Sequence, residues 1–412
     1  MPDRDGHTAR NTAHDIVLFG ATGFTGALTA EYLAVHRPAG CRLALAGRNR
    51  SKLEALRGRL AKLDPALREL PLLHADATDP RSLRAVAEAT RVVITTVGPY
   101  IHYGEALVAA CAEAGADYVD LTGEPEFVDR MFLRYHQQAV RTGARIVHAC
   151  GFDSIPHDLG AYFTVRQLPE DVPITVDGYV RAVGTISGGT FHSAVTAASR
   201  ARQAMATAMA RRRADPPPAG RRIRTPLGRP SRIGRLWAVP LPTIDPQIVA
   251  RSAAALPRYG PDFSYRHYAA IKRLVTIAGL GAGLTAIGVL SNIPPARRWL
   301  LNRRKPGDGP SVARRAKSWF TVRFVGHGGG QRVVTEVAGG DPGYGETAKM
   351  LAESAFCLAF DDLPPTAGQV TTAVAMGDAL IDRLRAKDIV FQVVEGPAPD
   401  TATRPKLFRI AR

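Results

Sequence analysis

Three glycines near the N-terminus have a spacing that suits phosphate binding. Gly20, Gly23 and Gly26 follow an apolar run at 16–20 and precede a helix-like segment at 25–36. Glycines at a strand-to-helix turn let the backbone approach a pyrophosphate, which then lies on the N-terminus of the helix. The spacing predicts a dinucleotide site, and the predicted contacts are Gly20, Thr22, Gly23, Phe24, Thr25 and Gly26.

The end of the second apolar run indicates which dinucleotide binds. Proteins that bind NAD place an acidic residue about 20 residues after the glycines, where it holds the ribose hydroxyls. Here the run ends in Arg48 and Asn49, without an acid. A guanidinium forms a forked pair with a 2′-phosphate, so we predict NADPH as the cofactor. The alternative is an exposed arginine at the start of a helix.

Two further strand ends complete the predicted cofactor site. Asp76 ends the third run, where it either accepts from the adenine amino group or caps the helix that starts near Pro80. Thr96, Gly98 and Pro99 end the fourth run and are predicted to border the nicotinamide ribose, because the carboxyl ends of the strands line the binding crevice.

The elements that carry these residues alternate regularly. Apolar β-rich runs separated by helix-like segments are typical of a parallel sheet covered on both faces. We therefore predict an α/β fold with a doubly wound Rossmann domain at 15–152, after a disordered tail at 1–14. The predicted strands are 16–20, 42–47, 70–76, 91–98, 117–123 and 144–152, and the predicted helices are 25–36, 51–63, 80–89, 103–114 and 125–142.

The pattern changes after Phe152 and predicts a second, α+β domain at 153–365. Residues 214–262 are rich in proline and arginine and are predicted to be irregular. Residues 366–412 are predicted to form a last helix and strands. The expected elements are a strand at 173–181, a helix at 189–213, a hairpin of 318–326 with 331–339, helices at 343–360 and 366–387, and strands at 389–395 and 405–410.

A resemblance to a known superfamily rests on seven motifs. Together they cover about residues 15–395 and resemble the saccharopine dehydrogenase-like superfamily, with the mycobacterial trans-acting enoyl reductases as the closest branch. The motifs are GATGFTG (20–26), AGRN (46–49), TTVGPY (95–100), YVDLTGE (118–124), CGFDSIPHDLG (150–160), GDPGYGETAKML (340–351) and TTAVAMGDALIDRL (371–384).

The resemblance implies a fold and an activity. The C-terminal helices are expected to return to the Rossmann domain. The implied reaction is the NADPH-dependent reduction, in trans, of an enoyl thioester on an acyl carrier domain of a polyketide synthase, as in the assembly of phthiocerol and phenolphthiocerol lipids. The alternatives are another oxidoreductase of the superfamily, and a non-catalytic, membrane-associated protein that binds NADP(H).

Such a reduction needs a proton donor and a group that holds a developing enolate oxygen. The candidate donors are Tyr100, Tyr103 and His157, and the candidates for the oxygen are Ser154 and a backbone N–H near Gly151. Alternatively, Tyr100 only packs, and Asp153 and Ser154 cap the following helix. The spacing of Tyr268 and Lys272 resembles the YxxxK pair of short-chain dehydrogenases, but these residues lie outside the Rossmann domain and are interpreted as a chance match.

The positive charge of the chain is localised. Residues 200–320 contain 24 Lys+Arg and 4 Asp+Glu, whereas the remaining residues contain 30 and 33. This basic insertion predicts one anionic partner, either an anionic membrane surface or an acidic carrier domain. No nucleic-acid module is recognised. A plain solvated surface remains an alternative, and a homodimer is left open.

An uncharged run of 20 residues lies at 274–293, inside the basic insertion. Its length reaches the threshold for a membrane span, but a span would separate the hairpin at 318–339 from the nucleotide site. We therefore predict an apolar membrane-like segment that inserts from one side, at the cytoplasmic face of the inner membrane, with a buried core helix as the alternative. The four cysteines form no CxxC pair, so no metal and no disulfide are predicted.

Overall fold

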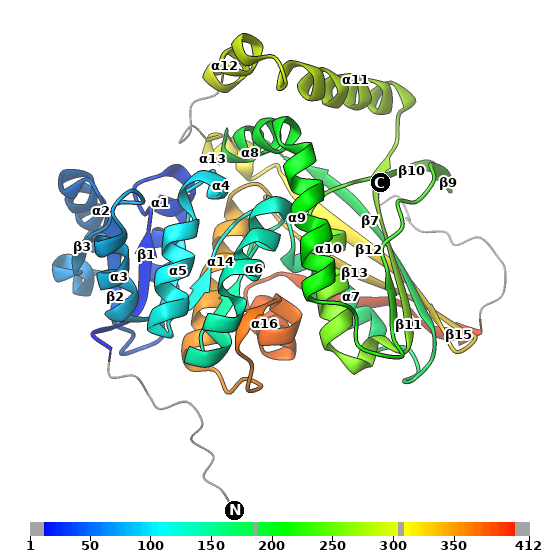
Figure 1. The fold of residues 1–412 in the computed structure, drawn as a ribbon, viewed down its shortest axis with the longest axis horizontal. Coiled ribbons are helices and arrows are strands. Elements are labelled where there is room, and N and C mark those ends of the chain that lie inside the picture. The colour runs from blue at the N-terminus through cyan, green and yellow to red at the C-terminus, as the bar shows by residue number, and fades with distance from the viewer. Residues whose placement is uncertain (1–11, 185–187, 304–308, 400–412) are drawn as a thin grey trace, which may run out of the picture.

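The computed structural model describes residues 12–184, 188–303 and 309–399. Two β-sheets organise the described chain, and helices cover both of them (Figure 1). The predicted α/β fold, with a Rossmann-like sheet and a second domain, is confirmed. Among the described residues the four cysteines form no disulfide.

The first sheet has seven strands within the described ranges, and all of its pairs are parallel. Six of them follow the 3-2-1-4-5-6 order of dinucleotide-binding folds, which confirms the six predicted strands. In spatial order the strands are β14 (Gly368–Val370), β6 (Arg145–Val147), β5 (Asp117–Val119), β4 (Thr90–Thr95), β1 (His14–Phe19), β2 (Leu43–Gly47) and β3 (Leu72–His74).

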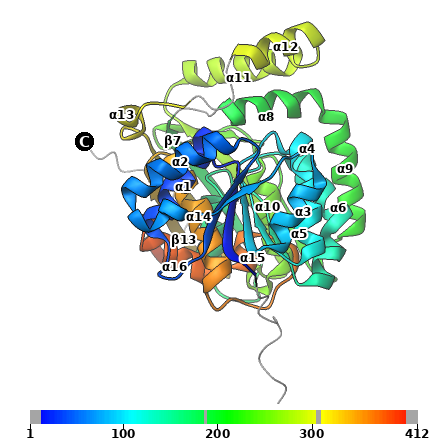
Figure 2. The same cartoon turned by 90° about the vertical axis from the view of Figure 1, so that its left-hand side faces the viewer.

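Helices cover both faces of this sheet (Figure 2). Alternate residues of β1 point to opposite faces, because the side-chain period of a strand is two. Ile16 and Leu18 pack into one core, and Val17 and Phe19 pack into the other. The first core includes α1 (Phe24–His36), α2 (Arg50–Leu63) and α14 (Gly345–Phe360), and the second includes α3 (Pro80–Glu88), α5 (Glu105–Ala114) and α6 (Pro125–Thr142).

The second sheet has eight strands within the described ranges. Its centre is β7, which pairs parallel with β11 and antiparallel with β12. β12 and β13 form the predicted hairpin, and Gly329 and Gly330 make its turn with positive φ angles. The strands are β7 (Ile174–Val183), β8 (Arg222–Arg224), β9 (Ser231–Ile233), β10 (Leu236–Pro240), β11 (Asp262–Ile271), β12 (Trp319–Gly328), β13 (Gln331–Gly339) and β15 (Val390–Pro399).

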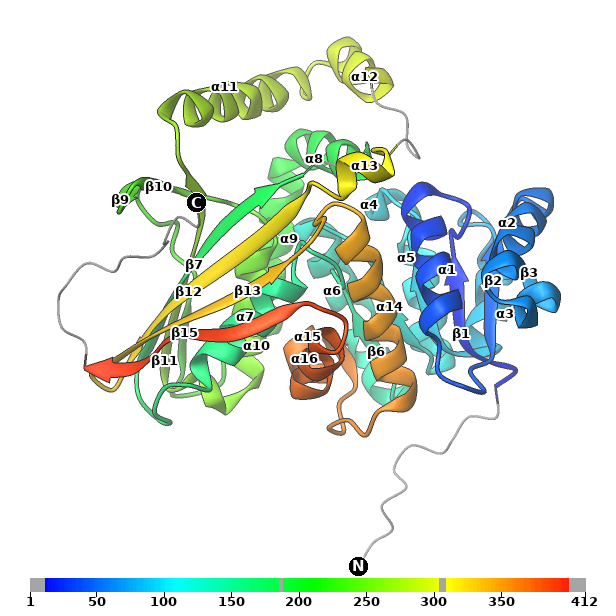
Figure 3. The ribbon, with the colours of Figure 1, turned by 180° about the vertical axis from the view of Figure 1, so that it is seen from behind.

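Helix α7 (Ile155–Val165) joins the two sheets. It starts just after β6 and packs on β12, where a Cβ at Gly160 would overlap the ring of Phe324. The first core therefore continues from the parallel sheet into the second sheet. The chain later returns to the first sheet through α14 and β14, and its last described element, β15, lies on the second sheet (Figure 3).

Several predicted elements differ from the structure. The helix predicted at 189–213 is two helices, α8 (Gly188–Ser199) and α9 (Ala201–Ala214), because Arg200 leaves helical geometry. The segment predicted as irregular contains β8, β9, β10 and α10 (Asp245–Ala255). The helix predicted at 366–387 is β14, α15 (Thr372–Ala375) and α16 (Gly377–Arg385), because Gly368 and Gly377 take positive φ angles.

The chain ends also refine the predictions. Residues 12–14 of the predicted tail are ordered, since His14 begins β1 and the hydroxyl of Thr12 donates to the carbonyl of His14. The rest of that tail and the strand predicted at 405–410 lie outside the described residues.

The uncharged run forms α11 (Leu274–Leu290), followed by α12 (Pro294–Arg303). The alternative of a buried core helix is wrong, because side chains such as Val275 and Val289 are largely exposed. Across the described ranges, every helix is too short or too polar to cross a membrane.

Candidate active site

The glycine loop lies at the carboxyl edge of the parallel sheet, directly after β1. Gly20 has a φ of +87°, which favours glycine. Its carbonyl oxygen accepts from the N–H of Gly23 and from the hydroxyl of Thr96, both at 3.1 Å. A Cβ at Gly26 would overlap the same carbonyl oxygen. The structure thus brings Gly20, Gly23, Gly26 and Thr96 together in one tight turn.

The start of α1 fits a pyrophosphate. Gly23 precedes the helix without a side-chain cap, and its first turn carries no acidic residue. The N–H groups of that turn therefore remain available to an anion, which the helix dipole also favours. Thr22 and Gly23 are exposed at the loop tip, whereas the ring of Phe24 turns away and packs edge-on against Tyr344 at 4.8 Å between centroids. Phe24 thus offers its backbone at this helix start, and the contact of Thr25 with the cofactor stays a prediction.

The remaining residues predicted to bind the cofactor lie at the ends of β2 and β3. Arg48 is exposed at the end of β2, and its positive charge acts on the carboxylate of Asp76 at the end of β3. Asn49 uses its side chain to cap α2. The carboxylate of Asp76 accepts from the backbone and the hydroxyl of Thr78, and Asp79, not Asp76, caps α3. The alternative of Asp76 as the cap of this helix is therefore wrong, while its contact with adenine stays a prediction.

The loop after β4 holds two of the predicted proton donors. Tyr100 begins the short helix α4 (Tyr100–Tyr103), just after Gly98 and Pro99. Its hydroxyl donates to the carbonyl of Thr95 and accepts from the N–H of Leu121, both at 3.2 Å. Burial raises the pKa of Tyr100 well above its ordinary range. These contacts favour the packing role that was the alternative for Tyr100. Tyr103 is exposed.

A buried acid, which the sequence analysis did not single out, fixes this loop. Glu124 follows β5, and its carboxylate accepts from the N–H groups of Tyr100 and Ile101 at 3.0 and 2.9 Å. It also accepts from the hydroxyl of Ser193 on α8 at 2.7 Å. Glu124 therefore ties α4 of the Rossmann domain to α8 of the second domain.

The loop after β6 brings the other candidates into a buried polar cluster. His157 Nδ1 lies 2.9 Å from Asp245 Oδ1, but the two atoms are not aligned for a hydrogen bond. His267 Nε2 lies 3.5 Å from Asp245 Oδ2. The Ser154 hydroxyl is buried without a partner among the described residues, and it does not cap α7. Buried polar atoms without partners are rare, so this cluster points to a functional site.

Asp153 stands beside this cluster with a perturbed acidity. Its carboxylate faces the loop after β5, since a Cβ at Gly123 would lie 3.1 Å from Asp153 Oδ2. Burial, helped by the charge of Asp245, raises the pKa of Asp153 to about 6. Burial also acts to raise the pKa of Asp245, but the neighbouring His157 and His267 outweigh it and lower that pKa. Two acids with opposite shifts provide a proton donor and a permanent anion.

The same cluster contains ligand atoms of the kinds that bind metals. His157, Asp245 and His267 each offer one such atom, all within 4.8 Å of one another. Two imidazoles and a carboxylate suit several divalent ions. No spacing in the sequence indicates this set, because its members come from α7, α10 and β11. Burial lowers the pKa of His267 to about 4, so this imidazole is neutral at physiological pH.

Three of the residues that form the site were missed as site residues. The sequence predicts Asp153 only as a possible helix cap, places Glu124 only within a motif, and places Asp245 in the segment predicted to be irregular. The signal for Asp153 is its place directly after the strand predicted at 144–152. Asp245 offered no signal, because only the packing of α10 against α7 brings it near His157.

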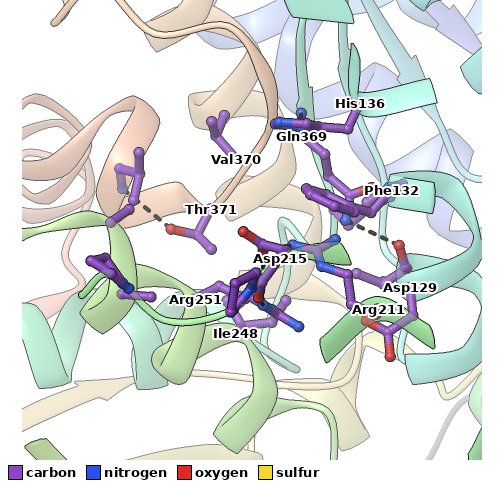
Figure 4. Close-up of a pocket in the computed structure, with 17 residues that line it drawn as sticks. Asp129, Phe132, His136, Arg211, Asp215, Ile248, Arg251, Gln369, Val370 and Thr371 are labelled. Atoms are coloured by element: carbon purple, nitrogen blue, oxygen red, sulfur yellow. Dashed lines mark hydrogen bonds and ion pairs between the residues drawn. The ribbon is translucent and has the colours of Figure 1, made fainter. Parts of the chain in front are cut away.

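A cavity of about 420 Å³ lies elsewhere, between α6, α9, α10 and β14 (Figure 4). The carboxylate of Asp215 accepts from both Arg211 and Arg251, at 2.8 and 2.9 Å. Burial, together with the charge of Arg251, lowers the pKa of Arg211 to about 9. None of the predicted site residues lines this cavity, and Arg211 Nε and Nη1 are buried there without a hydrogen-bond partner among the described residues.

The YxxxK match has no structural support. Tyr268 lies on β11 and stacks on Tyr179, with 5.3 Å between the ring centroids. Lys272 follows the end of that strand, so the two residues do not share the helix that such a pair requires. The interpretation as a chance match is confirmed.

Comparisons with known proteins agree with this geometry. Residues 16–147 match the Saccharopine dehydrogenase NADP binding domain. A Mycobacterium tuberculosis protein, provisionally named a trans-acting enoyl reductase, is 40% identical and aligns over 93% of this chain and 98% of its own. A Mycobacterium bovis protein named trans-acting enoyl reductase is 38% identical, over 91% of this chain and 96% of its own.

A solved structure gives a more distant match. Saccharopine dehydrogenase (L-Glu forming) from Saccharomyces cerevisiae matches with a TM-score of 0.53 and 12% identity, and the match covers 92% of this chain and 100% of that one. At this identity the match shows the fold alone.

Proposed function

Because the chain belongs to the trans-acting enoyl reductases, a family with the NADP-binding domain of saccharopine dehydrogenases, we propose that it reduces the double bond of an enoyl thioester carried by another protein. It is an NADP-dependent oxidoreductase. The observation that carries the proposal is the cluster of Asp153, Ser154, His157 and Asp245 at the carboxyl edge of the parallel sheet.

This edge is where the reactive half of a bound dinucleotide belongs. In folds with this strand order the dinucleotide lies across the switch point, with one nucleotide over each half of the sheet. The glycine loop follows β1, and Arg48 follows β2. The loop with Asp153 follows β6 in the other half, about 14 Å from β1 if strands are spaced by about 4.8 Å. Asp153 is therefore on the side that suits the nicotinamide.

The residues divide the chemistry between them. NADPH supplies the hydride when it is bound. The backbone N–H groups at the start of α1 hold the pyrophosphate, and Arg48 pairs with the 2′-phosphate. Asp153 donates a proton to the carbon next to the thioester carbonyl, because its raised pKa keeps a protonated fraction near neutral pH. The Ser154 hydroxyl donates to the carbonyl oxygen as that oxygen gains negative charge.

Asp245 and His157 act as positioning residues in this scheme. The negative charge of Asp245 helps to keep Asp153 protonated. His157 lies against that carboxylate and against the ring of Phe152, with 5.5 Å between the ring centroids. Their contribution is therefore to the acidity of Asp153 and to the geometry of its loop.

The substrate class and the setting belong to the same proposal. We infer an acyl carrier domain of a polyketide synthase as the donor of the enoyl chain, in the assembly of phthiocerol-type lipids. The names of the relatives support an enzyme that acts on a chain held by another protein. The basic insertion at 200–320 offers positive charge to an acidic carrier domain.

The test is to follow NADPH oxidation with an enoyl chain on an isolated carrier domain and on coenzyme A, with NADH in parallel. We expect turnover that prefers NADPH and the carrier-bound substrate, with a saturated thioester as product. Tight NADPH binding without turnover on either thioester would contradict the proposal. Turnover of an amino or keto substrate instead would assign the site to another reaction of the superfamily.

A further inference from the structure

Helices α11 and α12 form a layer that lies outside both sheets. All three ribbon views place this layer over α8, at the top of the molecule (Figures 1, 2 and 3). Within the described residues, the main contacts of α11 are with α8, α12 and the end of β11. The body of the protein therefore covers little of this layer.

The layer exposes apolar side chains. Val275 is 82% exposed and Val289 is 58% exposed, and Ile293 and Trp299 are exposed as well. A Cβ built at Gly279 or Gly281 would meet nothing within 4 Å. The sequence of α11 contains no charged residue. A helix that is apolar all round is normally buried, in a protein core or in lipid, so this one requires a cover.

Positive charge frames the apolar surface. Lys272 and Arg273 precede α11, Arg297 and Arg298 lie on α12, and all four are exposed. The sequence has no acidic residue between Asp262 and Asp308. The cover is therefore anionic where it meets the helix ends and apolar where it meets the helix itself.

The sheet topology keeps both ends of the layer on one side. β11 ends just before the layer and β12 begins after it, and both strands pair with β7. A helix of 17 residues is about 25 Å long, whereas the hydrocarbon core is about 30 Å thick. The helix therefore cannot cross a bilayer, but it can lie in the plane of its surface.

We propose that residues 272–303 bind the surface of an anionic lipid bilayer, with α11 buried at the boundary between headgroups and acyl chains and with Lys272, Arg273, Arg297 and Arg298 on the lipid phosphates. Lipid explains both features, because acyl chains remove apolar surface from water while anionic headgroups attract the cations beside it. A symmetric dimer would place the same cations against each other. A carrier domain would meet the cations but would leave most of an all-round apolar helix uncovered.

The test is flotation of the full chain with vesicles of phosphatidylcholine alone and of phosphatidylcholine with phosphatidylglycerol. We expect the wild type to float with the anionic vesicles. Each lysine or arginine near the surface contributes about fivefold in affinity, so the variant Arg297→Glu/Arg298→Glu should bind at least about 25-fold more weakly. The variant Val275→Asp/Val289→Asp should bind about 100-fold more weakly.

A matched control keeps the result specific to this layer. Val35 on α1 and Leu63 on α2 are 59% and 53% exposed, and Val35→Asp/Leu63→Asp should float like the wild type. NADPH binding by every variant shows that it is folded. On binding, the fluorescence of Trp299 should shift to shorter wavelength, and Trp299→Phe should remove that shift.

Two results would overturn the proposal. The first is a wild type that floats with neither kind of vesicle, and the second is a Val275→Asp/Val289→Asp variant that floats as well as the wild type. In the first case, a dimer, or a complex with an isolated carrier domain, that the same variant abolishes would assign the layer to a protein partner instead. Because flotation needs no turnover, its outcome is independent of the proposed reaction.

Discussion

Replacing Asp153 by asparagine should slow the reductase and also make the folded protein more stable. Burial and the nearby charge of Asp245 raise the pKa of Asp153 from 3.8 to about 6. A rise of this size corresponds to about 3 kcal/mol of penalty on the carboxylate in the folded state. Because Asp153 is only half-buried, solvent screening reduces this to about 1–2 kcal/mol.

The sign of the effect on stability follows from linkage. The pKa is higher in the folded protein than in the unfolded chain, so the penalty is absent below the unfolded value of 3.8 and complete above about 6. Asparagine carries no charge at any pH. Asp153→Asn should therefore exceed the wild type by about 1–2 kcal/mol in urea unfolding near pH 7. The difference should shrink toward zero as the pH falls to about 4.

The sign of the effect on activity is the opposite. The protonated acid is the donor, so the rate of the wild type should fall as the pH rises through about 6. Asp153→Asn should lower the turnover number by about 100-fold to 10,000-fold, and it should remove this limb of the pH profile. The control is Asp171→Asn, on an exposed loop where a φ of +56° suits asparagine. The control should keep the rate, the profile and the stability of the wild type.

The reasoning fails if Asp153→Asn keeps its activity within about tenfold and retains the pH profile. It also fails if the variant loses both activity and stability. That combination would mean that the negatively charged carboxylate supports the fold, and that its acidity has no part in the reaction. Measuring NADPH oxidation and urea unfolding on the same preparation separates these outcomes.

The other predictions concern the cofactor, the fold and metal. Arg48→Ala should raise the KM for NADPH by about 10-fold to 100-fold and leave that for NADH nearly unchanged, as steady-state kinetics would show. Gly26→Ala, whose methyl group would overlap the carbonyl of Gly20, should abolish NADPH binding in calorimetry. Asp158 accepts from two hydroxyls and from the N–H of Ala373, so Asp158→Ala should cost about 3–5 kcal/mol in urea unfolding. Prolonged treatment with a chelator should leave the turnover number unchanged, and a loss restored by one divalent ion would contradict the prediction of no metal.

The elements of the Rossmann domain could be predicted because their signals are local. The strand that begins at His14 alternates between two cores, and the glycines at 20–26 follow it directly. Each signal lies within a short stretch of sequence, so the strand order and the cofactor loop follow from general rules. The prediction of one helix at 366–387 is wrong, because its helical pattern does not reveal the positive φ angles of Gly368 and Gly377.

The acid cluster could not be predicted, because it depends on packing between distant parts of the chain. Asp153 and His157 belong to one motif, but Asp245 and His267 come from α10 and β11 of the second domain. A buried carboxylate beside two imidazoles changes the acidity of Asp153, and no spacing within residues 150–160 carries that information. The sequence also cannot predict whether α11 is buried or exposed, since the same apolar pattern suits a core helix and a surface helix.

The surface layer is joined to the crevice by two separate contacts, and this decides how its role should be tested. α8, which lies under α11, holds Glu124 through the hydroxyl of Ser193. After the layer, Gly309 lies against the ring of Phe24 in the glycine loop, and the guanidinium of Arg315 lies 5.9 Å from the centre of that ring. Deleting the layer of α11 and α12 would disturb the cofactor loop, so a loss of activity in that variant would say nothing about lipid binding. Substitutions at exposed valines of α11 leave both contacts in place, and with them a change in vesicle binding reports on the layer alone.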